Sequence, residues 1–514
     1  MSHVDLERSP SRAPADVVPS LALLMAGAML TAGYANRWGA PLFGWIAPVP
    51  FLLYARRVQG RGWWALFAAV TAGSLAQTVK VVTDPISPLV ILPFGLTAAL
   101  GTFVAIGVWR VIFRRRGEVA ALYAFPAATA LKEWALLEHT ELGMWGTYAA
   151  GQVDSLELLQ LASLAGVPGI GFLMAWVGSA IALVLGAPGA MRYRAHVAAA
   201  AVALLAANLW GGVRVHTVSR GPTVAVGAVT TSLGLTASGL PSAAELAENE
   251  DALFRRTELA AERGARVVVW NEAATLVPPA EEARLVDRGR EHARRLGVDL
   301  VLAYGTIESE SPLLLGNRYA WISSEGEVLE TYEKHHPVPG EPSIRGDAPL
   351  RALDRPWGRS AGAICYDYDF PAMAREHARL GVGLVAVPAS DWLGIDPYHT
   401  QFTRIRAIEG GFSVVRPVRD ATSAAYDPYG RLRGAMSAWE DGEHVMVAAV
   451  PVERVETVYA GVGDWPLVVL CVVILAGCVS HRGRLRGRRV GDASDGQARR
   501  VCGVLREDGG LDRA

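Results

Sequence analysis

The sequence predicts a protein in two parts, an α-helical membrane domain of about eight spans and an α/β sandwich domain. Three observations lead to this fold class. The 514-residue chain is 51% hydrophobic and only 19% charged, and its mean hydropathy is +0.24. Most apolar runs lie before residue 213, whereas residues 213–460 alternate Val-rich strands with helical segments. The chain is also too long for a single compact core, so at least two domains are expected.

Eight apolar runs have the roughly 17–25 residues that a membrane-spanning helix needs. Seven of them fall within the first 212 residues, too many to be the buried helices of one soluble core. The second run is short and contains Pro48 and Pro50, which makes its ends hard to define. The predicted spans are residues 18–36, 39–55, 63–82, 88–112, 118–138, 169–187, 195–212 and 463–480.

Basic residues predict how these spans are oriented. Arginine clusters follow spans two, four, six and eight, while the other loops hold scattered cations such as Arg37 and Lys80. Because cytoplasmic loops carry an excess of Lys and Arg, we expect all four clusters on the cytoplasmic side. This orientation places residues 213–460 outside the cytoplasmic membrane. The clusters are Arg56, Arg57 and Arg61; Arg114, Arg115 and Arg116; Arg192 and Arg194; and Arg482, Arg484, Arg486, Arg488 and Arg489.

The predicted spans and their orientation also define the domain boundaries. Residues 1–17 are polar and contain Pro10 and Pro14, which predicts a disordered cytoplasmic N-terminus. The run from Ser20 is too long for a signal-peptide core and has no small-residue cleavage site, so we expect a retained span. The membrane domain is then 18–212, the extracytoplasmic domain 213–460, the last span 463–480 and the basic cytoplasmic tail 481–514. The net charge of −1 gives no indication of nucleic acid.

Within residues 223–450, Val-rich runs alternate with helical segments. Such continuous apolar runs are typical of strands buried on both faces of a sheet. No glycine-rich phosphate loop follows a strand, so nucleotide binding has no support. The predicted strands are 223–229, 265–270, 299–305, 317–323, 328–333, 360–364, 383–387, 411–418, 424–426 and 445–450, and the predicted helices are 242–263, 280–296 and 372–380.

Three reactive residues directly follow predicted strands. They are Glu272, Lys334 and Cys365. Strand ends gather along one rim of an α/β sheet, so these side chains are expected to meet. Each alone is more often a surface or core residue, but Cys365 is the only cysteine of the domain and has no disulfide partner there. Together they predict a site built around a nucleophilic thiol.

The chemistry of the three residues is complementary. The Glu272 carboxylate is suited to take the proton of the Cys365 thiol. The Lys334 ammonium favours a thiolate and is suited to hold the oxyanion of a tetrahedral intermediate. No cofactor or metal is required, and the adjacent His335 and His336 would face opposite ways in a strand.

Two of these strand ends resemble motifs of the nitrilase, or carbon–nitrogen hydrolase, superfamily. Residues 332–341 resemble its lysine motif, and residues 364–367 its nucleophile motif, with Asp367 where the superfamily usually has Glu. The resemblance implies an αββα sandwich with a Glu–Lys–Cys triad. It further implies that Glu341 is a second glutamate beside the triad. Tyr366, Asp367, Trp392 and Phe402 are the candidate binding or supporting residues.

Segments of the membrane half resemble the apolipoprotein N-acyltransferase branch of that superfamily. They are residues 131–134, 143–145, 151–152, 160–162 and 169–173. This resemblance implies a bacterial inner-membrane enzyme that takes an acyl chain from a phospholipid, through a cysteine thioester. The implied acceptor is the N-terminal amine of a diacylglyceryl-cysteine lipoprotein, and no nucleic acid or cofactor is involved.

Four departures from the family pattern leave an alternative open. The Pro-Glu-Ser around the catalytic glutamate is Asn271-Glu272-Ala273, and the segment 341–365 is short. Residues 390–393 and 420–423 also differ from the usual motifs. The alternative is a membrane-tethered carbon–nitrogen hydrolase, an amidase or nitrilase, that passes the acyl group of an amide substrate to water. A tether needs one span, however, not eight. Trp392 and Leu393 are further expected to reach the headgroup layer of the bilayer.

Overall fold

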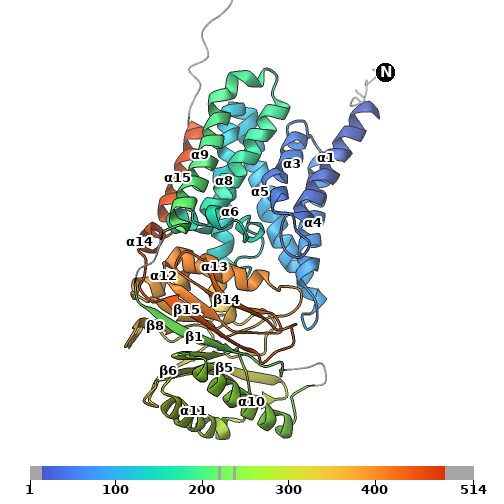
Figure 1. The fold of residues 1–514 in the computed structure, drawn as a ribbon. Helices are drawn as coiled ribbons and strands as arrows, with labels where there is room; N and C mark the ends of the chain where they lie inside the picture. The colour runs from blue at the N-terminus through green and yellow to red at the C-terminus, as the bar shows by residue number, and fades with distance from the viewer. Residues whose placement is uncertain (1–13, 218–220, 235–238, 481–514) are drawn as a thin grey trace, which may run out of the picture.

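The protein consists of a helical bundle that stands on an α/β sandwich (Figure 1). The computed structural model describes residues 14–217, 221–234 and 239–480. The first strand and the last strand of the sandwich pair with each other, so the chain enters and leaves this domain at neighbouring strands. The two-part organisation predicted from the sequence is therefore visible in the structure.

Every predicted span corresponds to a helix or a helix pair. The second is divided at Ala47, with Pro48 at the first position of the following helix, where proline is well tolerated. The first helix begins at Pro14, inside the segment predicted to be disordered; residues 1–13 and 481–514 lie outside the described residues. The helices are α1 Pro14–Gly33, α2 Pro41–Ile46, α3 Pro48–Ala55, α4 Gly62–Val81, α5 Ile91–Arg116, α6 Glu118–His139, α8 Ala162–Gly186, α9 Arg194–Val215 and α15 Trp465–Ser480.

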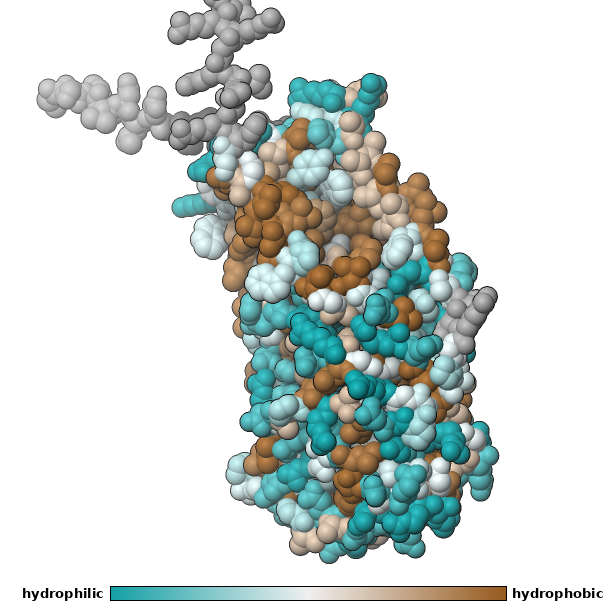
Figure 2. All heavy atoms as spheres, turned by 90° about the vertical axis from the view of Figure 1, so that its left-hand side faces the viewer, coloured by the Kyte–Doolittle hydropathy of each residue, from teal (hydrophilic) through white to brown (hydrophobic). Residues whose placement is uncertain are grey.

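Several of these helices are apolar enough to cross a membrane. Among the described residues, three are both long and apolar enough, namely Pro88–Arg116, Ala162–Gly186 and Ala190–Val215. Three apolar helices are shorter: Ser20–Gly33, Pro41–Ala55 and Trp465–Ser480. Figure 2 shows the apolar surface over the helical bundle and mostly hydrophilic residues over the sandwich. The number of eight spans stays a prediction.

Contacts bring the loops after the even-numbered spans to one end of the bundle. Arg56 binds the Glu118 carboxylate at 2.8 Å and the carbonyl oxygen of Gly186 at 3.1 Å. Arg116 donates to the carbonyl oxygen of Val479, near the end of α15. The sandwich lies at the opposite end (Figure 1). The side of the membrane that the basic end faces stays a prediction.

The sandwich contains two large sheets packed face to face, and β10 and β12 pair in a separate two-stranded sheet. One has the strand order β15-β1-β2-β4-β5-β6, with β3 beside β4, and the other the order β14-β13-β11-β9-β8-β7. The strands are β1 Thr223–Val229, β2 Val267–Trp270, β3 Leu276–Val277, β4 Asp299–Glu310, β5 Leu313–Ile322, β6 Val328–Glu333, β7 Leu353–Arg355, β8 Gly358–Gly362, β9 Leu384–Ala386, β10 Ala389–Ser390, β11 Ser413–Arg416, β12 Val418–Arg419, β13 Thr422–Tyr426, β14 Leu432–Ser437 and β15 Val445–Pro451.

Helices cover both outer faces of this pair of sheets. Helices α10 (Ala243–Glu262) and α11 (Glu282–Leu296) cover the first sheet, and α12 (Pro371–Arg379) and α13 (Tyr398–Gly410) lie between the second sheet and the bundle (Figure 1). One apolar core joins the inner faces of the two sheets. The predicted α/β sandwich is therefore confirmed, with four layers.

Helix α13 is the main element that the sequence analysis did not predict. Nearly all of its residues are buried, because its outer face packs against the bundle. Phe402, Ile405 and Ile408 join an apolar cluster with bundle residues such as Met144. A helix covered on all sides lacks the polar face that makes an amphipathic helix recognisable. This covered layer is where the bundle and the sandwich meet.

Candidate active site

Cys365 lies at a sharp turn between a buried strand and a short helix. Strand β8 ends at Gly362, and the 3₁₀ helix η5 (Cys365–Asp369) begins three residues later. The backbone of Cys365 is left-handed, with φ of +49°, and its N–H donates to the carbonyl oxygen of Pro388 at 2.8 Å. A non-glycine residue keeps such a conformation only where its surroundings impose it, and such positions cluster at active sites.

Asp367 holds this turn in place. Its buried carboxylate accepts hydrogen bonds from the Ile364 N–H at 2.9 Å, the Tyr332 hydroxyl at 2.8 Å and the His336 N–H at 2.7 Å. Burial raises the pKa of Asp367, but the hydrogen bonds and the charge of His336 outweigh it, so this pKa lies below its ordinary value. The structure thus places Asp367 behind the turn as a support.

Lys334 joins two glutamates at the edge of the first sheet. Its ammonium lies 2.7 Å from a carboxylate oxygen of Glu272 and 2.7 Å from one of Glu341. The Asn317 amide donates to both carboxylates, at 2.7 Å and 3.0 Å. Burial lowers the pKa of Lys334, but the charges of the two glutamates outweigh it, so the pKa stands well above its ordinary value. The lysine is therefore held as an ammonium.

The Cys365 thiol lies beside this lysine cluster and is only 2% exposed. Burial and the charge of Glu272 raise the pKa of the thiol well above its ordinary value, although Lys334 and Arg416 oppose them. Lys334 thus lowers the pKa of the thiol, as expected, but burial and Glu272 raise this pKa by more. Cys365 therefore rests as a protonated thiol, which would need a base in order to act as a nucleophile.

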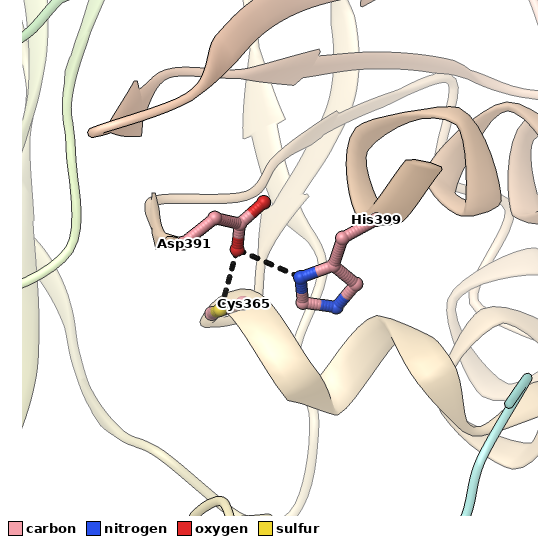
Figure 3. A group of neighbouring side chains, drawn as sticks. All are labelled: Cys365, Asp391 and His399. Carbon is pink, nitrogen blue, oxygen red and sulfur yellow. Dashed lines mark hydrogen bonds and ion pairs between the residues drawn. The ribbon is translucent and has the colours of Figure 1, made fainter. Parts of the chain in front are cut away.

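A second group of charged side chains lies beside Cys365 (Figure 3). His399, from α13, lies 2.7 Å from an Asp391 oxygen through Nδ1 and 2.8 Å from an Asp369 oxygen through Nε2. Arg416, from the end of β11, lies 3.0 Å from Asp391. Burial lowers the pKa of His399, but its two carboxylate partners raise it to about 9, so the ring is an imidazolium.

The donor atoms of Cys365, Asp391 and His399 all lie within 4.8 Å of one another, as the ligands of a metal ion would. The Arg416 guanidinium, however, already lies 3.0 Å from Asp391 Oδ1 and 2.9 Å from His399 Nδ1. Both ring nitrogens of His399 also face carboxylates. Because a cation already occupies this position and no imidazole lone pair is free, the residues fit an ion-pair network and not a metal centre.

An open cavity joins Cys365 to the helical bundle. Tyr366 and Trp392, two candidates for lining a pocket, lie in its wall, whereas Phe402 packs against Trp145. The Trp392 indole donates to the carbonyl oxygen of Val81 at 2.6 Å, so this side chain closes the cavity against α4, while Leu393 is exposed. The apolar part of the bundle wall is formed by Val81, Val82, Ile86, Val90, Phe94 and Ala98.

The segment after α6 connects the bundle to the nucleophile turn. The Tyr366 hydroxyl donates to the carbonyl oxygen of Glu141, and Trp145 lines the cavity. Within the bundle, the Glu133 carboxylate accepts from the Tyr148 N–H at 2.7 Å, and Lys132 donates to the Gly146 carbonyl at 3.4 Å. The segments 131–134 and 143–145, noted for their family resemblance, therefore shape one wall of the site.

Sequence reasoning named the lysine cluster but missed the role of the second charged group. Asp391 and Arg416 lie at or just after the ends of β10 and β11, so the rule that found Glu272 applies to them as well. His399 lies in α13, which the sequence analysis did not predict. No periodic pattern pointed to it.

Comparisons with known proteins agree with both parts of the structure. The family model for carbon–nitrogen hydrolase matches residues 223–460, and the model for the apolipoprotein N-acyltransferase N-terminal domain matches residues 26–180. The apolipoprotein N-acyltransferase of Bradyrhizobium diazoefficiens is 30% identical over 442 residues, covering 77% of this chain and 80% of the relative. That of Geobacter metallireducens is 26% identical over 510 residues, covering 90% and 96%.

Among solved structures, an amidase from Nesterenkonia sp. is similar to part of the chain. It is 23% identical, with a TM-score of 0.39, and the match covers 49% of this chain and 97% of the amidase.

Proposed function

Because the chain belongs to the apolipoprotein N-acyltransferase family, we propose that it transfers an acyl chain from a phospholipid to lipoproteins. The acyl group passes through a thioester on Cys365 to the N-terminal amine of a diacylglyceryl-cysteine lipoprotein. The supporting observation is the cavity, which has Cys365 on one side and apolar helices on the other. Such a cavity admits a lipid chain to a buried thiol while limiting the access of water.

In the first half of the reaction, Glu272 takes the proton of the Cys365 thiol and the thiolate attacks the ester carbonyl. Lys334 stabilises the resulting oxyanion. The Tyr366 N–H assists, because it lies in the first turn of η5, where N–H groups have no acceptor within the helix. The ester C–O bond then breaks, the proton on Glu272 passes to the leaving oxygen, and the lysophospholipid departs.

In the second half, the lipoprotein amine attacks the thioester carbonyl and gives a proton to Glu272. The C–S bond breaks, and Cys365 regains a proton as the thiol. Glu341 keeps Lys334 charged and in place, which supports its role as the second glutamate of the site. Hydrogen bonds of 2.7 Å from Lys334 to both glutamates support this assignment of roles.

The proposal includes the placement of the enzyme in the bacterial inner membrane. Eight spans, with the arginine-rich end in the cytoplasm, put residues 213–460 on the extracytoplasmic side. The meeting of the even-numbered loops at the end of the bundle away from the sandwich supports this orientation. A reporter fused after Gly212 should be exported, and one fused at Arg194 should stay inside; the reverse pattern would contradict the orientation.

The decisive experiment separates acyl transfer from hydrolysis. The purified full-length chain is mixed with phospholipid alone, and its intact mass is followed. A transferase accumulates an acyl-enzyme that is consumed only when a diacylglyceryl-cysteine peptide is added, and the peptide gains the same acyl mass. Cys365→Ser should trap the acyl group as a more stable oxygen ester.

The outcome that contradicts the proposal is equally specific. A membrane-tethered amidase would release carboxylate without any amine acceptor, would prefer a soluble amide to phospholipid, and would leave the peptide unacylated. Cys471→Ser serves as the control, because Cys471 lies in α15 and should not change either result.

A further inference from the structure

Arg416 is a buried cation in direct contact with the nucleophile, and the catalytic roles given above do not use it. Its side chain is 0% exposed. One nitrogen, Nη2, lies 3.9 Å from the Cys365 sulfur, within reach of a weak hydrogen bond to sulfur. Among the residues that the structure describes, its Nε and Nη1 have no hydrogen-bond partner. A fully buried guanidinium with unused donors is costly to keep, which favours a function for it.

Two sets of charged groups act on the sulfur of Cys365. One is Lys334 with its two glutamates. In the other, Sγ lies 3.7 Å from the Ser390 carbonyl oxygen and 3.8 Å from Asp391 Oδ1. Arg416 lowers the pKa of the thiol more than Asp391 raises it. The charged and titratable groups around Sγ are Glu272 after β2, Lys334 after β6, Glu341 after Lys334, Tyr366 and Asp369 in η5, Asp391 after β10, His399 in α13 and Arg416 in β11.

The neighbouring charges fix the position of Arg416. Asp391 Oδ1 lies 2.7 Å from His399 Nδ1 and 3.0 Å from Arg416 Nη2, so one carboxylate oxygen accepts from two cations. His399 is anchored at its other nitrogen by Asp369, 2.8 Å away, in the same short helix as Cys365. The network therefore connects four segments, the end of β10, β11, α13 and η5, and leaves the guanidinium beside the sulfur.

We propose that Arg416 is a second cation for the nucleophile, which binds the Cys365 thiolate in addition to Lys334. Asp391, His399 and Asp369 are positioning residues that hold the guanidinium against the sulfur. In the resting enzyme the thiol proton faces Ser390 and Asp391, and it leaves to Glu272. The sulfur then becomes a hydrogen-bond acceptor, and an N–H of Arg416 donates to it.

The same contact acts when the thioester breaks. When the tetrahedral intermediate formed by the amine collapses, the C–S bond breaks and its electron pair returns to sulfur. Arg416 stabilises the leaving thiolate. Lys334 is free at that moment to hold the oxyanion on the carbonyl side. This second step rests on the proposed function, whereas stabilisation of the thiolate in the free enzyme does not.

The test measures the reactivity of Cys365 without any lipid substrate. In the full-length chain with Cys471, Cys478 and Cys502 replaced by Ser, iodoacetamide labelling is followed against pH. Arg416→Gln keeps a donor for Asp391 and removes the charge. We expect a higher apparent thiol pKa and, at neutral pH, labelling slower by about tenfold or more, because an opposite charge at this distance shifts a pKa by about one unit or more. Arg416→Lys keeps the charge on a shorter side chain. Its apparent thiol pKa and its labelling rate should lie between those of wild type and Arg416→Gln.

Arg406 provides a matched control. It is also 0% exposed and paired with a buried acid, Glu409, but no contact joins it to Cys365. Arg406→Gln should therefore leave the labelling profile unchanged in folded protein, as judged by thermal unfolding. A wild-type profile in folded Arg416→Gln, or an equal shift in Arg406→Gln, would overturn the proposal. If Arg416→Gln does not fold, an unshifted profile in Arg416→Lys overturns it in the same way.

Failure of this proposal and failure of the proposed function are distinguishable. A shifted labelling profile in a chain that acylates no peptide would remove the lipoprotein function and keep the role of Arg416. Normal labelling by the Arg416 variants, together with normal peptide acylation, would remove only the role of Arg416.

Discussion

The helical bundle and the sandwich contribute different things to the one cavity that they share. The charged groups around Cys365 come from the sandwich. The bundle side of the cavity is lined by apolar residues and by neutral polar ones such as Asn36, Ser74 and Gln77, and no charged residue is among the described residues that line it. The chemistry of the site therefore belongs to the sandwich, and the access to it belongs to the bundle.

This difference explains how a hydrolase-like fold can serve a lipid reaction. A thiol with two neighbouring cations is suited to form an acyl intermediate with any activated carbonyl. The route by which a carbonyl reaches the thiol decides the substrate, and here that route passes an apolar wall formed by α4, α5 and the turn between them. Variants of the two sides should therefore fail in different ways.

The largest expected effect is that of Cys365→Ala. The proposed thioester forms on Cys365, so both acyl-enzyme and acylated peptide should disappear, while the thermal unfolding temperature changes little for the loss of one small side chain. Intact mass spectrometry after mixing with phospholipid measures this directly. Residual acyl-enzyme in the variant would show that the nucleophile lies elsewhere.

A charge in the bundle wall should separate access from chemistry. Phe94, in α5, lines the bundle side of the cavity. Phe94→Asp puts a carboxylate where the acyl chain must lie, and the cost of burying it should reduce acyl-enzyme formation by about tenfold or more. Labelling of Cys365 by iodoacetamide should fall much less than acyl-enzyme formation, since the variant leaves Lys334, Arg416 and their carboxylate partners in place. Phe94→Leu is the matched control, and equal losses in lipid reaction and labelling would break the division between the two parts.

Removal of the lysine charge should instead reduce both the labelling and the lipid reaction. Lys334→Met leaves the Glu272 and Glu341 carboxylates without their cation, so the pKa of the Cys365 thiol should rise further. Labelling at neutral pH should slow by about tenfold, and the rate of acyl-enzyme formation should fall by at least as much because the oxyanion also loses its donor. Unchanged labelling in folded protein would remove Lys334 from the site.

The fold could be predicted where apolar residues form long runs or Val-rich strands. The site could be predicted where reactive residues follow those strands. The eight apolar runs and the Val-rich strands locate nearly every helix of the bundle and the main strands of both sheets. Glu272, Lys334 and Cys365 were named because strand ends share a rim. The strength of burial around Cys365, which keeps the thiol protonated, depends on packing between distant segments and leaves no mark in the local sequence.

Helix α13 shows most clearly what could not be predicted from the sequence. It is covered by the sheet on one side and by the bundle on the other, so its sequence has neither a polar face nor a continuous apolar run. His399 was missed with it. A residue whose importance comes from two carboxylates on other elements, Asp369 and Asp391, is identified only when those elements are placed in space.

The smallest effect we predict is a pH dependence of stability that originates in His399. Its partners raise the pKa from the ordinary 6.5 to about 9 in the folded protein. A group whose pKa is raised by folding stabilises the folded state fully below its unfolded pKa, and it loses that contribution as the pH rises through the folded pKa. Stability from this residue should therefore be complete below pH 6.5 and fall between pH 6.5 and about 9.

His399→Gln isolates this contribution. The variant should unfold at a temperature a few degrees lower than wild type at pH 6, and the difference should shrink as the pH approaches 9. Burial raises the pKa of Asp391, but the charges of His399 and Arg416 outweigh it and lower this pKa to about 2. Asp391 therefore titrates far below this range and does not change how stability depends on pH there. Differential scanning calorimetry in detergent measures the unfolding temperatures of wild type and His399→Gln. A constant difference across the range would mean that His399 is neutral in the folded protein. The charges beside Cys365 would then be only those of Arg416, Lys334 and their carboxylate partners.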